Sequence, residues 1–350
     1  LFCWAESGCA WPALRRSLAL ALLCLGLVLL PGFFAAPALG ADLASALWTP
    51  EELAGSPGDR LQGALHQPDD SPPARTAPRR VLPPREEAGA VRRVDFAPGN
   101  RVVALTFDLC ELADRRAGYD AELVALLRRE RVAATFFAGG RWMMTHPEKA
   151  LQLMADPLFE VGAHGWTHGN MGVLEAEGRR EQILWTQAQY ELLREELARR
   201  AEAAGLPESV MADIPEVPTT FRPPYARCSL EALRELAGHG LTTVLWDVVA
   251  DEGNPDAREA ARSLAGRVRP GSIVLLHANG VPPHTARIVE EALPLLRGKG
   301  FSFVTVGELL RAGRAETSRD CWFTHPGDSR IYDQKYGDGT RRPRRDAVTP

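Results

Sequence analysis

The sequence predicts an α/β domain whose parallel sheet is curled into a barrel-like form. From about residue 98, short apolar runs rich in β-branched residues alternate with helical stretches, which is typical of parallel strands joined by helical crossovers. The alternation continues for about 215 residues, a length that suits a (β/α) barrel. Polar residues follow four of the apolar runs, and parallel α/β folds place their functional groups at such strand ends.

The expected elements follow one another along this domain. We expect strands within the stretches 101–109, 133–140, 159–168, 219–225, 242–250, 271–279 and 301–306. We expect helices at 119–132, 147–154, 174–204, 229–238, 257–268, 285–300 and 307–313. The helix at 174–204 is long and charged, and its apolar residues favour packing on the barrel, with a contact to a second copy of the chain as the alternative.

The regions outside this domain differ from it in composition. Arg15 and Arg16 precede an apolar run that small residues close near Gly40 and Ala41, the pattern of a secretory signal peptide. We therefore expect a signal peptide at residues 1–41 and an exported protein, periplasmic or secreted, without a stable membrane span after cleavage. A retained membrane anchor is the alternative.

The remaining boundaries follow from proline and charge. Residues 42–97 are rich in both and are expected to form a largely disordered linker. The folded domain then spans residues 98–312. Residues 313–350 form a polar tail that we expect to pack partly on the domain, with its last ten residues disordered.

Charge and cysteine content narrow the classes of function. The formal net charge of −4 gives no electrostatic reason to expect a nucleic-acid partner. Without the signal peptide three cysteines remain, Cys110, Cys228 and Cys321, so an exported chain cannot pair them all internally. We expect buried thiols with at most one disulfide.

Candidate catalytic side chains lie at the ends of four expected strands. Asp108 ends the first strand, His164 and His168 follow the third, Asp247 lies in a later strand, and His277 ends the strand "IVLLH". On a helical turn, the spacing of His164 and His168 brings two imidazoles to one face, as in zinc sites. His277 has a side chain suited to proton transfer near neutral pH.

A further candidate is Arg222 in the stretch "FRPPY". Pro223 and Pro224 restrict the backbone beside its guanidinium, which is the group that best clamps a carboxylate. By itself this motif is better explained as a proline-rich turn with a surface arginine.

Taken together, the succession "TFD", "HGWTH", "RPPY", "LWDVVADE" and "IVLLH" resembles the polysaccharide deacetylases of carbohydrate esterase family 4, the nodulation-type deacetylases. The stretches "ATFFAGG" and "GFSFVTVGELL" are also similar to that family, and the resemblance runs from about Arg101 to Leu310. It implies a distorted (β/α) barrel and the removal of N-acetyl groups, by hydrolysis of a carbon–nitrogen bond, from an N-acetylated polysaccharide or oligosaccharide. It also implies a divalent metal, with zinc as the expected ion, held by His164 and His168.

The resemblance implies a role for each of the other motif residues. Asp108 matches the general base, which takes a proton from the metal-bound water that acts as nucleophile. Arg222 matches the arginine that orients this base. His277 matches the general acid that protonates the leaving amine, and the backbone near Tyr225 is implied to help hold the oxyanion.

The first departure from the family pattern concerns the metal. Leu109 stands where the family usually has a second aspartate, which completes the metal site with the two histidines. We expect Glu111 to substitute for it, because its side chain is long enough to reach a metal from the loop after the strand. Cys110 is the alternative, since a thiolate is a good soft ligand for zinc, and Asp114 also lies just past the strand end.

The second departure concerns the general acid. Val249 stands where an aspartate normally tunes the catalytic histidine. Asp247 lies two residues away on the same strand face, and Asp251 follows shortly after, so either is a candidate to compensate.

Two other functions fit the same residues. One is a metal-independent hydrolase of another carbon–nitrogen bond on the same fold. The other is a non-catalytic carbohydrate-binding protein that keeps the groove. The joint presence of Asp108, Arg222 and His277 argues against the second, because an idle site needs no base, clamp and acid together.

Overall fold

The computed structural model of the chain describes residues 42–251 and 256–340. The signal peptide expected at 1–41 and the last ten residues of the tail lie outside these ranges. Among the helices of the described ranges, none combines the length and the apolar character needed to cross a membrane.

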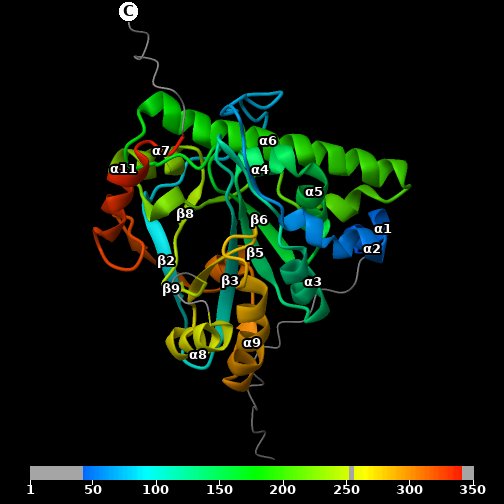
Figure 1. The fold of residues 1–350 in the computed structure, drawn as a ribbon, viewed down its shortest axis with the longest axis vertical. Helices are drawn as coiled ribbons and strands as arrows, with labels where there is room; N and C mark the ends of the chain where they lie inside the picture. Colours follow the sequence, from blue (N-terminus) through cyan, green and yellow to red (C-terminus); the bar gives the residue numbers. More distant parts are fainter. Residues whose placement is uncertain (1–41, 252–255, 341–350) are drawn as a thin grey trace, which may run out of the picture. The chain divides into compact units, whose positions relative to one another are not determined.

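A ten-stranded sheet forms the centre of the fold (Figure 1). Its strands are β2 (Ala90–Asp95), β3 (Val102–Leu109), β5 (Ala134–Ala138), β6 (Phe159–Ala163), β7 (Thr220–Phe221), β8 (Thr242–Val244), β9 (Val248–Val249), β10 (Ile273–His277), β11 (Ser302–Phe303) and β12 (Arg314–Ser318). They follow the order β12-β2-β8-β7-β6-β5-β3-β10-β9, with β11 paired to β3. The pairing of β12 with β2 is antiparallel and the others are parallel. The expected distorted (β/α) barrel is confirmed.

Helices connect and cover the strands (Figure 1). They are α1 (Leu43–Leu47), α2 (Pro50–Ala54), α3 (Ala121–Arg129), α4 (Gly140–Thr145), α5 (Pro147–Ala155), α6 (Ala176–Ala203), α7 (Leu230–Gly238), α8 (Ala257–Arg267), α9 (Thr285–Gly298), α10 (Val306–Ala312) and α11 (Ile331–Tyr336). Capping side chains define the N-termini of several helices: Asp120 accepts a hydrogen bond from a backbone N–H of α3, Ser229 from one of α7 and Asp256 from one of α8. These bonds satisfy backbone N–H groups that have no partner within the first turn of a helix. The long helix expected at 174–204 is confirmed as α6.

The alternation of side chains along β3 separates two cores. Leu105, Phe107 and Leu109 pack in the larger hydrophobic cluster, which includes residues of α3, α5, α6 and α9. Ala104 packs in the second cluster, with residues of β2, β7 and β8. Because successive strand residues point to opposite faces, Asp108 lies on the face opposite Leu109.

One expected strand is divided in two. The stretch 242–250 forms β8 and then β9, with a break at Leu245–Asp247. Across this break the chain changes its neighbour: the backbone N–H of Leu245 donates to Val91 of β2, whereas that of Asp247 donates to Ile273 of β10. The divided strand therefore connects two separate parts of the sheet.

Residues 42–97 differ from the expected disordered linker. Leu43 and Trp48 are buried in the larger core, and residues 90–95 form β2, inside the sheet between β12 and β8. The proline-rich part is held by a carboxylate, because Glu191 of α6 accepts hydrogen bonds from the backbone N–H groups of Arg79 and Arg80. These contacts satisfy backbone donors that a segment without regular structure otherwise leaves to water.

The tail is joined to the domain in two ways. Strand β12 pairs with β2, and a disulfide links Cys228 to Cys321. Cys110 is the cysteine of the described residues that is not in this disulfide, so the expectation of at most one disulfide is met among these residues.

Candidate active site

The general base and the general acid expected from the sequence lie side by side. Strands β3 and β10 are parallel neighbours, and their register places His277 opposite Asp108. The backbone N–H of Ala278 donates to the carbonyl of Asp108 at 3.0 Å, which fixes the two strand ends at the same level. Both side chains therefore come from the carboxyl end of the sheet, where such folds place their sites.

Arg222 holds the Asp108 carboxylate in the core of the protein. Its Nη1 donates to Asp108 Oδ1 at 2.8 Å, and its Nη2 donates to the carbonyl of Leu245 at 3.2 Å. The guanidinium lies 4.0 Å from the centre of the Phe137 ring. Burial lowers the pKa of Arg222 while Asp108 raises it, and an arginine keeps its proton in proteins. The sequence motif "FRPPY" therefore forms a buried clamp, not a surface turn.

His277 is oriented by Asp251 and not by Asp247, which corrects one expectation. The His277 Nδ1 lies 3.2 Å from Asp251 Oδ2, which also accepts from the His277 backbone N–H at 2.6 Å and from Thr285 Oγ1 at 3.0 Å. Asp247 instead accepts from Ser272 Oγ and from the backbone N–H of Ile273, both at 3.0 Å. The alternation of side chains along the strand predicted the face on which Asp247 lies but not its distance from His277. Asp247 is bonded to Ile273, which lies four residues, or about 13 Å, from His277 along β10.

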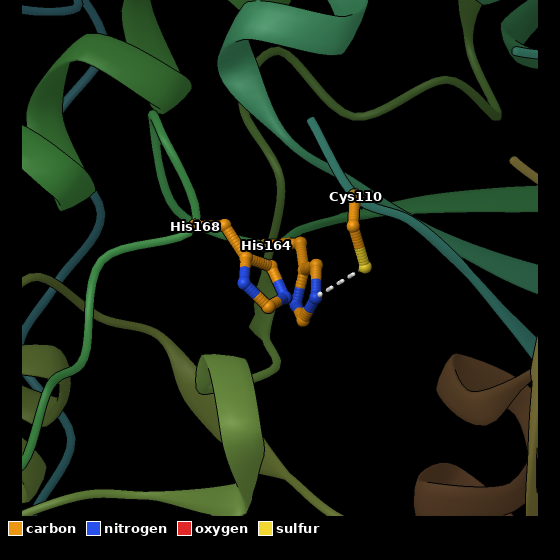
Figure 2. Close-up of side chains that lie close together, drawn as sticks. All are labelled: Cys110, His164 and His168. Carbon is orange, nitrogen blue, oxygen red and sulfur yellow. Dashed lines mark hydrogen bonds between the residues drawn. The ribbon is translucent and has the colours of Figure 1, made fainter. Parts of the chain in front are cut away.

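Three side chains that could hold a metal ion lie close together at this end of the sheet (Figure 2). One ligand atom from each of Cys110, His164 and His168 lies within 4.8 Å of the others. The sulfur of Cys110 points toward the His164 ring, at 3.4 Å from Nε2, and this Nε2 is 3.6 Å from Asp108 Oδ2. The two imidazole rings are 4.9 Å apart, centre to centre.

The histidines have the protonation that metal ligands need. His164 Nδ1 lies 2.8 Å from the carbonyl of Arg222, so this nitrogen carries the proton and Nε2 keeps its lone pair. His168 Nδ1 is buried and has no hydrogen-bond partner among the described residues. Burial lowers the pKa of both imidazoles, well below the usual value for His168, which favours the neutral form that binds metals.

Glu111 does not join this group, which corrects the expectation that it is the third metal ligand. Its carboxylate accepts from the backbone N–H of Ala117 at 3.1 Å and from Thr145 Oγ1 at 3.0 Å. The Glu111 side chain is buried on the side of the chain opposite that of Asp108 and Cys110, and this burial raises the pKa of its carboxyl group. The physical reason is the alternation of the strand, which continues for two residues past its end and brings Cys110, not Glu111, to the side of Asp108.

The loop that carries the two histidines is fixed by a residue that the sequence analysis did not single out. Gln182 of α6 accepts from the backbone N–H groups of Thr167 and Gly169, both at 3.0 Å, and donates to Thr167 Oγ1. The local sequence gives no signal for this contact, since Gln182 is one of many polar residues on a charged helix. The two histidines are brought together by a loop and not by a helical turn, and His168 adopts a φ of 61° in it.

Tyr225 lies next to this loop. Its ring is 4.4 Å from that of His168, and its backbone adopts a φ of 60°. Together, the carboxyl end of the sheet carries a clamped carboxylate, a cysteine and two histidines that could hold a metal ion, and an oriented imidazole. These groups are suited to hydrolysis of an acyl bond.

Known proteins resemble the chain over the region that holds these residues. The sequence pattern of the polysaccharide deacetylase family matches residues 96–244. A chitooligosaccharide deacetylase of a Bradyrhizobium species is 28% identical over 235 residues, which cover 63% of this chain and 96% of the relative. A chitooligosaccharide deacetylase of Sinorhizobium fredii is 30% identical over 196 residues, which cover 52% of this chain and 81% of the relative.

The fold is shared as well. A solved structure of a peptidoglycan N-acetylglucosamine deacetylase matches with a TM-score of 0.52 at 21% identity, covering 64% of this chain and 94% of that one. The family pattern, the relatives and the order of the motifs lead to one conclusion: the chain belongs to the polysaccharide deacetylase family.

Proposed function

We propose that this protein is an exported, zinc-dependent hydrolase that removes N-acetyl groups from an N-acetylated polysaccharide or oligosaccharide. The observation that carries the proposal is the meeting of Cys110, His164 and His168 beside the buried Asp108. Family membership and the chitooligosaccharide deacetylases among the relatives support the substrate class.

The donor set fits zinc. Thiolate sulfur and imidazole nitrogen are the ligands that zinc prefers, and three protein ligands leave a position open for chemistry. The buried Nδ1 of His168 has no hydrogen-bond partner among the described residues. The Nε2 of His164 keeps its lone pair, because the Nδ1 of that ring donates to the carbonyl of Arg222, and it faces the Cys110 sulfur at 3.4 Å. When bound, zinc polarises the acetyl carbonyl and makes water a better nucleophile.

The other residues move protons and hold charge. Asp108 takes a proton from the attacking water, and its bond to Arg222 aims one carboxylate oxygen while leaving the other toward the metal ligands. His277, held by Asp251, gives a proton to the leaving amine. The ring of Tyr225 lies beside that of His168, and the backbone at Tyr225 is the segment that we assign to the oxyanion.

The experiment compares zinc content and acetate release in the full chain and two variants. With Cys110→Ser the chain loses zinc, and acetate release from an N-acetylglucosamine oligomer falls with it. With Glu111→Gln, the matched control from the next residue, zinc content and acetate release stay at the wild-type level. Loss of zinc in Glu111→Gln but not in Cys110→Ser would contradict the ligand set.

Asp108→Asn tests the base in the same assay. We expect acetate release to fall by about 10²-fold to 10⁴-fold while zinc remains bound. If the wild type and Asp108→Asn both bind the oligomer and neither releases acetate, the protein is a carbohydrate-binding protein instead.

A metal-independent hydrolase is the second candidate, because Cys110 also belongs to a second cluster of polar side chains. Its sulfur lies within 4.8 Å of a side-chain atom of Asp108 and of His277, and Asp251 Oδ2 lies 3.2 Å from His277 Nδ1. A thiol beside an imidazole that a carboxylate orients can act as a nucleophile. His277 takes the thiol proton of Cys110, the thiolate attacks the acyl carbon, and His277 gives that proton to the leaving amine as the carbon–nitrogen bond breaks. Water then hydrolyses the thioester, which releases the acid and restores the thiol. Activity that survives chelation, with an acyl adduct on Cys110 in the mass spectrum, would favour this candidate.

Export is supported by the disulfide between Cys228 and Cys321, because such bonds persist in oxidising compartments. Cell fractionation of the full chain, beside a chain that lacks residues 1–41, tests it. We expect the full chain outside the cytoplasm and the shortened chain within it.

A further inference from the structure

The C-terminal segment, residues 319–340, lies against the two loops that carry His168 and Tyr225. The disulfide attaches it at Cys321 to Cys228, which follows Tyr225 by three residues. The indole N–H of Trp246 donates to the carbonyl of Phe323 at 3.0 Å. This segment follows the region that the family pattern matches, which ends at residue 244.

One carboxylate of this segment connects the two loops. Asp333 Oδ1 accepts from Asn170 Nδ2 at 2.9 Å and from Arg227 Nε at 2.9 Å, and Asp333 Oδ2 accepts from Arg227 Nη2 at 2.8 Å. Asn170 follows His168 by two residues, and Arg227 follows Tyr225 by two residues. Burial acts to raise the pKa of Asp333, but the bonds from Arg227 and Asn170 hold it below its usual range, so the bridge is charged at neutral pH.

The backbone of the same segment reinforces the contact. The N–H of Asn170 donates to the carbonyl of Asp338 at 2.7 Å. Gly339 packs so closely that a Cβ on it would lie 2.9 Å from the carbonyl oxygen of His168. The ring of Tyr336 stacks on that of Tyr225, with centres 5.0 Å apart.

The two loops need such support because their backbones are strained. His168, Tyr225 and Ala226 have φ values of 61°, 60° and 50°, a left-handed conformation that residues with a side chain seldom adopt. Conformations of this kind persist only where surrounding contacts impose them. The loops also contact each other directly through a backbone bridge between Met171 and Cys228, so Asp333 acts on a pair of loops that already touch.

We propose that Asp333 is a positioning residue that holds the His168 loop and the Tyr225 loop in the geometry needed to bind the metal and the oxyanion. The inference rests on the proposed function and goes beyond it, because it makes the C-terminal segment part of the catalytic unit. Asp333 touches neither metal nor substrate, and it acts through Asn170 and Arg227.

The test compares Asp333→Asn with Asp328→Asn in the full chain. Asp328 is the matched control, because it lies in the same segment and accepts from the backbone N–H groups of Phe323, Thr324 and His325, none of which lies in the two loops. Zinc affinity is measured by competition with a chromophoric chelator, the site geometry by the visible spectrum of the Co²⁺-loaded protein, and kcat and KM by acetate release from an N-acetylglucosamine oligomer.

We expect Asp333→Asn to weaken zinc binding by about 10-fold to 100-fold, as loss of an outer partner of a metal ligand does. It should also change the Co²⁺ spectrum and lower kcat more than it raises KM. Asp328→Asn should leave all three at the wild-type values, even where it lowers Tm. If Asp333→Asn does not fold, Arg227→Lys makes the same test, because a lysine keeps the charge but not the two-pronged bond to Asp333.

Equal zinc affinity, Co²⁺ spectrum and kcat in the wild type and Asp333→Asn would overturn the inference. Failure of the proposed function has a different signature, since the wild type itself then binds no zinc; that result would overturn both. A wild type that binds zinc but does not release acetate still tests the inference through zinc affinity and the Co²⁺ spectrum.

Discussion

Arg222 and Asp108 form an ion pair that is almost completely removed from water. Nη1 and Oδ1 are 2.8 Å apart, and the side chains are exposed by 0% and 5%. A charge in such a place is costly unless a partner and further hydrogen bonds compensate it. The carbonyls of Val244 and Leu245 supply those bonds for Arg222, so the pair and the sheet end around it form one structural unit.

Removing one member of this pair should destabilise the fold. With Arg222→Met, the Asp108 carboxylate stays buried without its counter-charge, and we expect the free energy of unfolding to fall by about 3–5 kcal/mol. Denaturant unfolding measures it. The control is Arg258→Met, which breaks the surface pair with Glu291 and should cost less than about 1 kcal/mol. Equal effects of the two substitutions would show that the buried pair is not a structural requirement.

The assignment of Asp251 gives a second prediction. Asp251→Asn weakens the contact that orients the His277 ring through Nδ1, so we expect kcat to fall by about 10²-fold. Asp247→Asn is the matched control, a neighbouring carboxylate held by Ser272 and Ile273, and should leave kcat unchanged. Acetate release from an N-acetylglucosamine oligomer decides between the two aspartates.

The parts of the site that the sequence predicted are those set by local pattern. The apolar run of β3 and that of β10 each end in a polar residue, and parallel strands of similar length bring such ends together. Asp108 and His277 are therefore opposite each other, as expected from the two strands alone. The motif resemblance added Arg222, whose isolated sequence is a simple proline-rich turn.

The parts that the sequence did not predict depend on contacts between distant segments. Residues 90–95 form a strand because β8 and β12 flank them, and nothing in their charged, proline-rich surroundings signals this. The choice of Cys110 over Glu111 depends on how the chain continues after Leu109. Side-chain length favoured Glu111, but the alternation of side chains along the strand continues past Leu109 and places Cys110 on the side of Asp108.

The buried carboxyl of Glu111 gives a prediction on pH and stability. Burial raises its pKa above the ordinary value of 4.5, against the bonds from Ala117 and Thr145. The folded state thus favours the protonated form, so this stabilisation is complete below the ordinary value and is lost as pH rises through the raised pKa. Glutamine at this position stays neutral at every pH. We therefore expect the Tm of Glu111→Gln to increase relative to that of the wild type as pH rises from about 4 to about 8.

The neighbours of Glu111 set the control for that experiment. His146 lies 3.9 Å from its carboxylate, and burial lowers the pKa of that imidazole. A lowered pKa of His146 destabilises the folded state at acidic pH in both the wild type and Glu111→Gln. Its effect therefore largely cancels in the difference between the two Tm values. Parallel Tm curves over the whole range would show that Glu111 does not titrate with a raised pKa.

The disulfide gives the last prediction, on the stability of the whole domain. Cys228 and Cys321 are 93 residues apart in sequence, and a bond across so long a loop strongly restricts the unfolded chain. We expect the double substitution Cys228→Ser with Cys321→Ser to lower the free energy of unfolding by about 2–5 kcal/mol. Reduction of the wild type should lower it by a similar amount, because both treatments release the same constraint. The same reductant should leave the double variant unchanged, which separates loss of this bond from any effect on Cys110. A wild type whose denaturation midpoint does not respond to reductant would show that the bond is absent or without effect on stability.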